Sequence, residues 1–167
     1  MKTQILTVIL FLGVVSCNNS KTNKIERKGE PTIYSVQDYD IEMNQAVEKA
    51  NLTLDNFRIA LLSDNRDFDC FALKTRFEMS KGGEHIWVGS ITIKDNKYFG
   101  VVANLPESTT EVKIGDTIQI KTDNISDWMY LDKKKLCGGY TIRVIRDRMT
   151  DPERKQFDIE NNIIIEE

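Results

Sequence analysis

The residues that could carry out chemistry are few, and they are scattered along the chain. His85 is the only histidine, and no cluster of cysteines surrounds it. Because zinc sites need three or four such ligands, we expect no metal and no cofactor. A nucleophilic mechanism would pair Cys70 or Cys137 with His85 and Asp127, but neither cysteine lies in a motif that activates a nucleophile. The sequence therefore predicts no catalytic residues.

A second group of side chains combines aromatic rings with charge. Its members are Trp87, Asp127, Trp128, Tyr130, Gly139, Tyr140 and Arg143. Tryptophan, tyrosine and arginine are common in binding hot spots, so on a concave face these residues would form a recognition surface. The alternative is that the aromatic rings fill the core.

Basic residues exceed acidic ones near the C-terminus. Between positions 133 and 155 there are eight basic residues and three acidic ones. The basic residues are Lys133, Lys134, Lys135, Arg143, Arg146, Arg148, Arg154 and Lys155. They form either a solvated helical face with local pairs, such as Arg143 with Asp147, or a patch for an acidic protein or small-ligand partner. The net charge of −3 for the whole chain argues against nucleic acid.

The N-terminus has the parts of an export signal. Lys2 is the positive region, Ile5 to Val15 form the apolar region, and Ser16 precedes the processing point. The apolar run is shorter than the roughly 20 residues that a membrane-spanning helix needs. Residues 1–16 are therefore predicted to be a signal peptide.

The segment Val14-Val15-Ser16-Cys17 resembles a bacterial lipobox, in which cleavage exposes a cysteine that is then acylated. Cys17 would carry the lipid, palmitate included, and residues 17–31 would form a polar tether. Each buried methylene contributes about 0.8 kcal/mol, so several acyl chains anchor a protein firmly. We expect an exported, membrane-anchored lipoprotein that faces the periplasm or the cell exterior. The alternative is an ordinary secretory leader.

Residues 32–167 are predicted to form one globular domain. Helical spacing of apolar residues predicts two helices, over 43–50 and 54–61. Alternating patterns predict antiparallel strands over 68–77, 85–94, 98–104 and 117–121, and 124–130 is a short strand or an irregular edge.

The C-terminal part is predicted to hold one or two helices. Residues 140–149 favour a helix, and Thr150-Asp151-Pro152-Glu153 has the signals of another helix start. The expected fold is α+β, with N-terminal helices packed on a strongly bent antiparallel sheet of four or five strands. Cys70 and Cys137 are either bridged, which an oxidising compartment allows, or two free thiols.

Several short segments, in this order, resemble the bacterial domain-of-unknown-function family 2314. They are Met43-Asn44, Phe71-Ala72-Leu73-Lys74, His85-Ile86-Trp87-Val88, Ile125-Ser126-Asp127-Trp128-Met129-Tyr130 and Gly138-Gly139-Tyr140-Thr141-Ile142-Arg143. The resemblance implies a small bacterial protein and assigns no catalytic residue. We expect an envelope-anchored, non-enzymatic binding module; the alternatives are a hydrolase that acts on an envelope component and a purely structural lipoprotein.

The lipobox can be tested at its cysteine. Cys17→Ala should leave the protein unprocessed or soluble, because the thiol is the predicted lipid acceptor. Detergent phase separation of cell extracts measures this, with the wild-type chain in the detergent phase and the variant outside it. A wild-type chain found in the aqueous phase would contradict the lipid anchor.

Overall fold

The computed structural model describes residues 23–25, 33–35, 40–80 and 82–166. The predicted signal peptide and Cys17 lie outside the described residues. None of the described helices has both the length and the apolar character needed to cross a bilayer.

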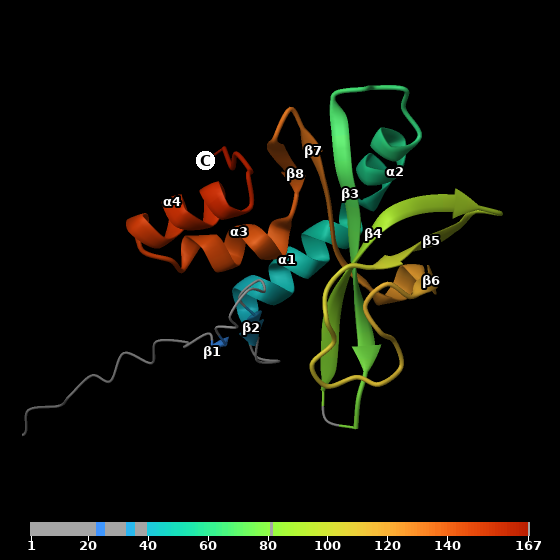
Figure 1. Ribbon diagram of the computed structural model, residues 1–167, viewed down its shortest axis with the longest axis horizontal. Helices are drawn as coiled ribbons and strands as arrows, with labels where there is room; N and C mark the ends of the chain where they lie inside the picture. Colours follow the sequence, from blue (N-terminus) through green and yellow to red (C-terminus); the bar gives the residue numbers. More distant parts are fainter. Residues whose placement is uncertain (1–22, 26–32, 36–39, 81, 167) are drawn as a thin grey trace, which may run out of the picture.

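A six-stranded antiparallel sheet forms the centre of the domain (Figure 1). Its strands are β3 (Phe68–Glu78), β4 (Gly83–Lys94), β5 (Lys97–Val102), β6 (Thr117–Ile120), β7 (Ile125–Asp132) and β8 (Lys135–Gly138). Their spatial order is β6-β5-β4-β3-β7-β8. Strands β3 to β6 form a meander, after which a short turn of 3-10 helix (Thr122–Asn124) precedes β7, which pairs with β3. Two short strands, β1 (Asn23–Ile25) and β2 (Ile33–Ser35), pair separately.

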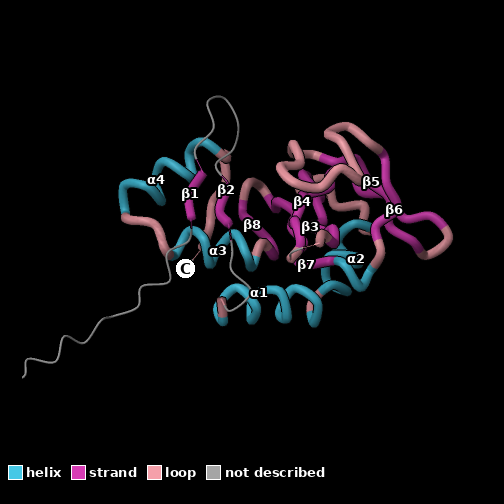
Figure 2. Tube along the Cα trace, turned by 90° about the horizontal axis from the view of Figure 1, so that it is seen from below, coloured by secondary structure: helices cyan, strands magenta, loops and turns pink. Residues whose placement is uncertain are grey.

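Helices α1 (Ile41–Leu52) and α2 (Leu54–Leu61) lie on one side of the sheet, below the strands in Figure 2. Ala50 from α1 and Phe57 from α2 are fully buried against Leu73, Val88 and Trp128 of the sheet. Burying a side chain of this size contributes about 1.5 to 3 kcal/mol. A second buried cluster joins Ile86, Val102 and Val112. The core therefore lies between the helical pair and one face of the sheet.

Helices α3 (Tyr140–Asp147) and α4 (Asp151–Glu160) lie together at one end of the domain (Figure 1). Arg148 follows α3 and binds both carboxylate oxygens of Asp40, the N-cap of α1, at 2.6 Å each, and Glu42 at 2.7 Å. The hydrogen bonds from Arg148 hold the pKa of Asp40 below its usual value. We call this contact the Arg148 clamp, and it ties the start of α1 to the end of α3.

The segment after α4 covers the edge of β8. Leu136 donates its backbone N–H to the carbonyl oxygen of Ile164 at 2.9 Å, and Ile164 donates to Lys134 at 2.8 Å. These bonds form a parallel bridge between Lys135 and Ile164. The segment is thereby added to the edge of the sheet at β8.

The α+β class is confirmed, with one strand more than the four or five expected. The extra strand is β8, which forms a hairpin with β7 through Lys133 and Lys134. Both lysines have left-handed backbone conformations, with φ of 48° and 73°. Such turns normally hold asparagine, aspartate or glycine, so two lysines do not indicate a turn at this position. The capping box of Thr150 and Glu153 at the start of α4 is confirmed.

Gly138 and Gly139 connect β8 to α3, with φ of 70° and 61°. Both angles are left-handed, a region where an L side chain costs about 1 to 2 kcal/mol. A Cβ at Gly138 would also meet the Trp128 carbonyl oxygen and the indole ring. Gly139 is the N-cap of α3, and a Cβ there would meet the side chain of Leu136. This connection therefore requires glycine for two reasons, conformation and space.

Gly138→Ala should destabilise the domain by about 3 kcal/mol or more, because strain and overlap with Trp128 add. Gly115→Ala is the matched control, since Gly115 has φ of 88° but open space around it. The control should lose only about 1 to 2 kcal/mol. Urea unfolding of both variants measures the free energy of unfolding. Equal losses of unfolding free energy in the two variants would show that the structure relaxes around the added methyl group and removes the overlap with Trp128.

Candidate functional site

Asp127 of β7 is fully buried and accepts four hydrogen bonds. One carboxylate oxygen accepts from the backbone N–H of Trp128 at 2.8 Å and of Tyr140 at 3.1 Å. The other accepts from the backbone N–H of Thr141 at 2.8 Å and from its hydroxyl at 2.6 Å. Asp127 thus acts as the cap of α3 from a neighbouring strand, and we call this arrangement the Asp127 cap.

Two opposing effects set the charge of Asp127. The pKa of the Asp127 carboxyl is raised above its ordinary value, because burial outweighs the hydrogen bonds from Thr141, the charge of Lys74 and the backbone donors, which lower it. A helix N-terminus carries about half a positive charge, which stabilises an anion placed there. Both oxygens of the carboxyl group therefore have hydrogen-bond donors, three of them from α3 and one from Trp128.

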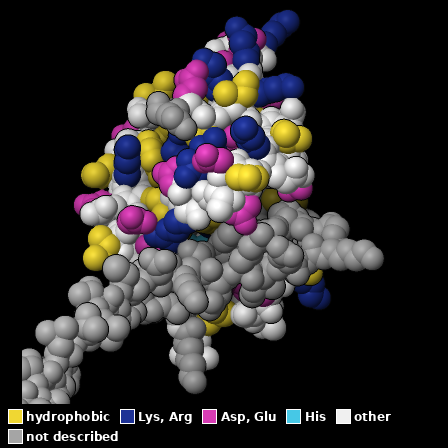
Figure 3. Space-filling view, turned by 90° about the vertical axis from the view of Figure 1, so that its left-hand side faces the viewer, with side chains coloured by type: hydrophobic (Ala, Val, Ile, Leu, Met, Phe, Trp, Pro, Cys, Tyr) yellow, Lys and Arg dark blue, Asp and Glu magenta, His cyan; other side chains and the backbone are white. Residues whose placement is uncertain are grey.

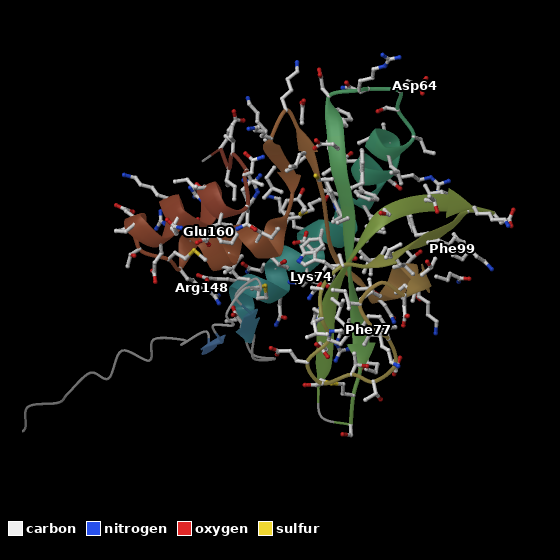
Figure 4. All side chains as sticks on the ribbon, in the orientation of Figure 1. Asp64, Lys74, Phe77, Phe99, Arg148 and Glu160 are labelled. Carbon is white, nitrogen blue, oxygen red and sulfur yellow. The ribbon has the colours of Figure 1, made fainter. Side chains whose placement is uncertain are left out.

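Lys74 of β3 lies between Asp127 and Trp87. It is the cross-strand neighbour of Trp87 on β4 and of Asp127 on β7, so the three residues form one row across the sheet. Its ammonium group donates to the Thr141 hydroxyl at 3.2 Å and lies 5.6 Å from the centre of the Trp87 ring. Lys74 and Trp87 are half-buried, and Figure 4 shows Lys74 near the middle of the molecule.

This row is on the side of the sheet opposite the main core. Leu73, Val88 and Trp128 form the adjacent row, and successive side chains of a strand point to opposite faces. The Leu73 row packs beneath α1 and α2. The Lys74 row therefore points away from those two helices.

His85 contacts the serine Ser126. Its Nδ1 lies 2.7 Å from the hydroxyl oxygen of Ser126, which also lies 3.3 Å from the carbonyl oxygen of Lys74. Ser126 is buried, while His85 is exposed. The hydrogen bonds of Asp127 go to α3, so the structure does not assemble the set of His85, Asp127 and a thiol.

Three of the proposed surface residues are buried. Asp127, Trp128 and Gly139 are in the interior, so they lie beneath any binding surface and do not form one. The Trp128 indole donates to the carbonyl oxygen of Ala50 at 3.0 Å and meets the Tyr140 ring at 87°. Trp128 is therefore part of the core, as expected if the aromatic rings fill the interior instead of forming a surface.

Tyr130 and Tyr140 are half-buried, and both rings contact Trp128. Tyr130 stacks on Phe71 with ring centres 5.1 Å apart. Burial and its neighbour Cys137 raise the pKa of Tyr130 to about 12. Tyr140 accepts a hydrogen bond from the hydroxyl of Thr53 at 3.1 Å, and Lys49 lies over its ring. Both tyrosines extend the core toward the surface.

Arg143 does not form the outward pair with Asp147 that its helical spacing suggested. Its guanidinium donates to the carbonyl oxygens of Gly138 at 3.0 Å, Leu136 at 2.7 Å and Glu166 at 3.2 Å. It therefore fastens α3 to β8 and to the segment that follows α4.

Six of the other seven basic residues of this region also bind within the chain. The lysine contacts are Lys133 with Asp67, Lys134 with Asn162 and Lys135 with Glu166. The arginine contacts are Arg146 with Asp158, Arg148 with Asp40, and Arg154 with the carbonyl oxygen of Met149. Figure 3, which views the end of the molecule with α3 and α4, shows basic and acidic side chains interspersed. Four of the eight basic side chains, those of Lys133, Lys135, Arg146 and Arg148, therefore face a carboxylate.

Cys70 and Cys137 are both free thiols. Burial and the neighbouring Asp69 raise the pKa of the Cys70 thiol, which disfavours the reactive thiolate. No group of three potential metal ligands occurs within the residues described above.

Sequence reasoning missed Lys74, Ser126 and Thr141. Lys74 stands at a polar position of an alternating strand, where lysine usually means exposure to solvent. Thr141 is the second residue of α3, and its contact with Asp127 follows from the glycine pair that turns the chain back toward β7. The combination of a strand aspartate with a later Gly-Gly-Tyr-Thr segment is the signal that could have indicated the cap.

Fold and site together define a small α+β domain whose central polar group caps a helix. The family model described as an uncharacterized protein conserved in bacteria, DUF2314, matches residues 40–163, and the chain belongs to this family.

Two proteins with curated descriptions are similar to this chain. The chain is 32% identical over 138 residues to the "Putative ankyrin repeat protein" of Neisseria meningitidis serogroup B, a match of 78% of this chain and 54% of the relative. It is 35% identical over 100 residues to the uncharacterized protein YegJ of Escherichia coli K12, which covers 60% of this chain and 64% of that protein. The chain thus spans less than two thirds of either relative. No solved structure matches it.

The Asp127 cap predicts different costs for two substitutions. Asp127→Asn places an amide group where a carboxylate oxygen accepts from Thr141, so a buried N–H loses its acceptor, at a cost of about 2 to 4 kcal/mol. Thr141→Val removes the hydroxyl that donates to Asp127 and accepts from Lys74, but keeps both backbone donors, and should cost about 1 to 2 kcal/mol. Chemical denaturation of the two variants compares them. A loss for Thr141→Val as large as for Asp127→Asn would contradict the dominant role of the backbone donors.

Proposed function

We propose that this chain is a non-enzymatic binding module that a lipid at Cys17 holds on the cell envelope. It faces the periplasm or the cell exterior, and it recognises a protein or a small ligand. This proposal is supported by the observation that the main charged side chains of the site bind the protein's own backbone. The Asp127 carboxylate and the Arg143 guanidinium, which could serve a reaction, are bonded to backbone groups of the fold.

A binding surface is supported best around Trp87 and Lys74. Both are half-buried on the side of the sheet that points away from α1 and α2. Tryptophan contributes strongly to binding hot spots, because its large ring brings much contact area at a small entropic cost. Tyr140 and Arg143 lie in α3, next to Thr141, which Lys74 contacts. Thr141 is the residue of α3 that borders this surface, because the Tyr140 ring is directed toward Thr53 and Lys49 and Arg143 is bonded to β8. Asp127, Trp128 and Gly139 are buried beneath it.

The relatives are compatible with binding. One of them is named as an ankyrin repeat protein, and ankyrin repeats stack into extended binding surfaces. A domain found in such a protein fits a role in recognition.

A hydrolase is the second candidate, favoured by the 2.7 Å contact between His85 and the Ser126 hydroxyl. A serine paired with an imidazole is the start of a nucleophilic mechanism. Ser126 is 3% exposed, however, and its hydroxyl also contacts the carbonyl oxygen of Lys74. Binding is therefore the better supported function, and a purely structural lipoprotein is the third possibility.

A pull-down tests the binding proposal. A lipid-free chain that starts at Asn18 is used as bait in envelope extract after mild cross-linking. Trp87→Ala is compared with Ile59→Ala, a matched control in which an apolar side chain, 69% exposed on α2, is shortened. We expect a partner to be recovered with the wild-type and Ile59→Ala chains and lost with Trp87→Ala.

Equal recovery with all three baits would contradict a surface at Trp87. Degradation of an envelope component by the wild-type chain, abolished in Ser126→Ala, would replace binding with the hydrolase candidate.

A further inference from the structure

The Lys74 ammonium has more hydrogen-bonding capacity than the fold uses. It carries three N–H donors, and its hydrogen bond within the described residues goes to the Thr141 hydroxyl at 3.2 Å. It also lies over the Trp87 ring, which attracts a cation but accepts no conventional hydrogen bond. Lys74 is half-buried as a residue, and its ammonium group has donors that the described residues do not use.

The nearest carboxylate does not fill this site. The oxygens of Asp127 accept from the backbone of α3 and from the Thr141 hydroxyl, and Lys74 reaches the carboxylate only through that hydroxyl. Among the residues that the structure describes, no ion pair joins Lys74 to a carboxylate. Burial lowers the pKa of Lys74, and Asp127 acts in the opposite direction. An additional anion would complete the hydrogen bonds of the ammonium group and offset its desolvation.

Trp87 supplies an apolar wall beside the ammonium group. Its backbone N–H donates to the side-chain oxygen of Asn104 at 2.8 Å, and β3 and β4 pair directly at Lys74 and Trp87. Both side chains thus stand on central strands, which hold them at a fixed separation. A charged group next to an aromatic plane is suited to a ligand that carries charge at one end and a flat or apolar body at the other.

We propose that Lys74 and Trp87 form a site for a small organic oxyanion, in which Lys74 binds a carboxylate or phosphate group and Trp87 contacts the apolar body of the ligand. This site rests on the binding function proposed above and names its ligand class. A protein partner would present the same chemistry as an acidic side chain or a C-terminal carboxylate.

Nuclear magnetic resonance of the full-length chain tests the site with acetate, benzoate and inorganic phosphate as probes. The chain has two tryptophans, and Trp87→Phe identifies the indole N–H signal of Trp87. We expect the Trp87 signal to shift as the probes are added, whereas the signal of the buried Trp128 stays in place. Benzoate should bind more tightly than acetate, because its ring contacts the Trp87 side chain. Comparison of the affinities for acetate and phosphate identifies the preferred oxyanion.

Lys74→Met should weaken binding of all three probes by about tenfold or more, since it removes a charge-assisted hydrogen bond but keeps an apolar side chain of similar length. Lys49→Met is the matched control, because Lys49 also lies over an aromatic ring, that of Tyr140 at 5.1 Å, but outside this site. Its affinities should equal those of the wild type. Trp87→Leu should abolish the preference for benzoate over acetate while acetate still binds.

Unchanged affinity in Lys74→Met, or an equal loss in Lys49→Met, would overturn the site. The same holds if the Trp87 signal fails to move with any probe. If Lys74→Met does not fold, Lys74→Arg retains the charge and should still bind, and Trp87→Leu keeps the test decisive. Because the probes are small anions, failure here is distinct from failure of the pull-down, in which a partner could bind Trp87 without any anion.

Discussion

The Asp127 cap is the interaction on which the rest of the structure depends. A fully buried carboxylate on β7 receives two backbone N–H groups and a hydroxyl from the first turn of α3, and it thereby fixes where that helix begins. From this starting point α3 directs Arg143 to the carbonyl oxygens of β8, and the chain that follows it brings Arg148 to the start of α1. A buried carboxylate is tolerable only when donors surround it, and here the donors are supplied by the helix that it positions.

Charge in this protein is mainly a means of joining segments that are distant in sequence. The basic residues near the C-terminus look like a patch when they are read in order, but in space each arginine of the group faces a carboxylate or backbone carbonyl oxygens. Arg148 and Asp40 are 108 positions apart, a separation at which charge patterns in the sequence carry no information on pairing. Lys74 is different, since its ammonium group bonds to a neutral hydroxyl and to no other group among the residues that the structure describes.

The sequence predicted the features that depend on local patterns. Apolar spacing located α1 and α2, and alternation located β3 to β6. Asp95 and Asn96, residue types that are common in such turns, connect β4 to β5 with φ of 49° and 61°. The same turn geometry at Lys133 and Lys134 was missed because lysines give no such indication. At the candidate site, Asp127, Gly139 and Tyr140 were correctly grouped, yet as a surface instead of a buried cap. Lys74 could not have been found, because its surroundings come from strand pairing and from a helix that begins 66 residues later in the chain.

The Arg148 clamp has a mechanical consequence. Any force applied through the chain that precedes Asp40 acts first on the N-cap of α1, where a helix would ordinarily begin to unravel. At this residue two parallel hydrogen bonds from Arg148 pass the load to the end of α3, which is fastened to β7 and β8. Figure 4 places Arg148 at the end of the molecule where α1 begins. Tension is therefore distributed over two helices and the sheet, so that the domain resists being peeled apart from its N-terminal side.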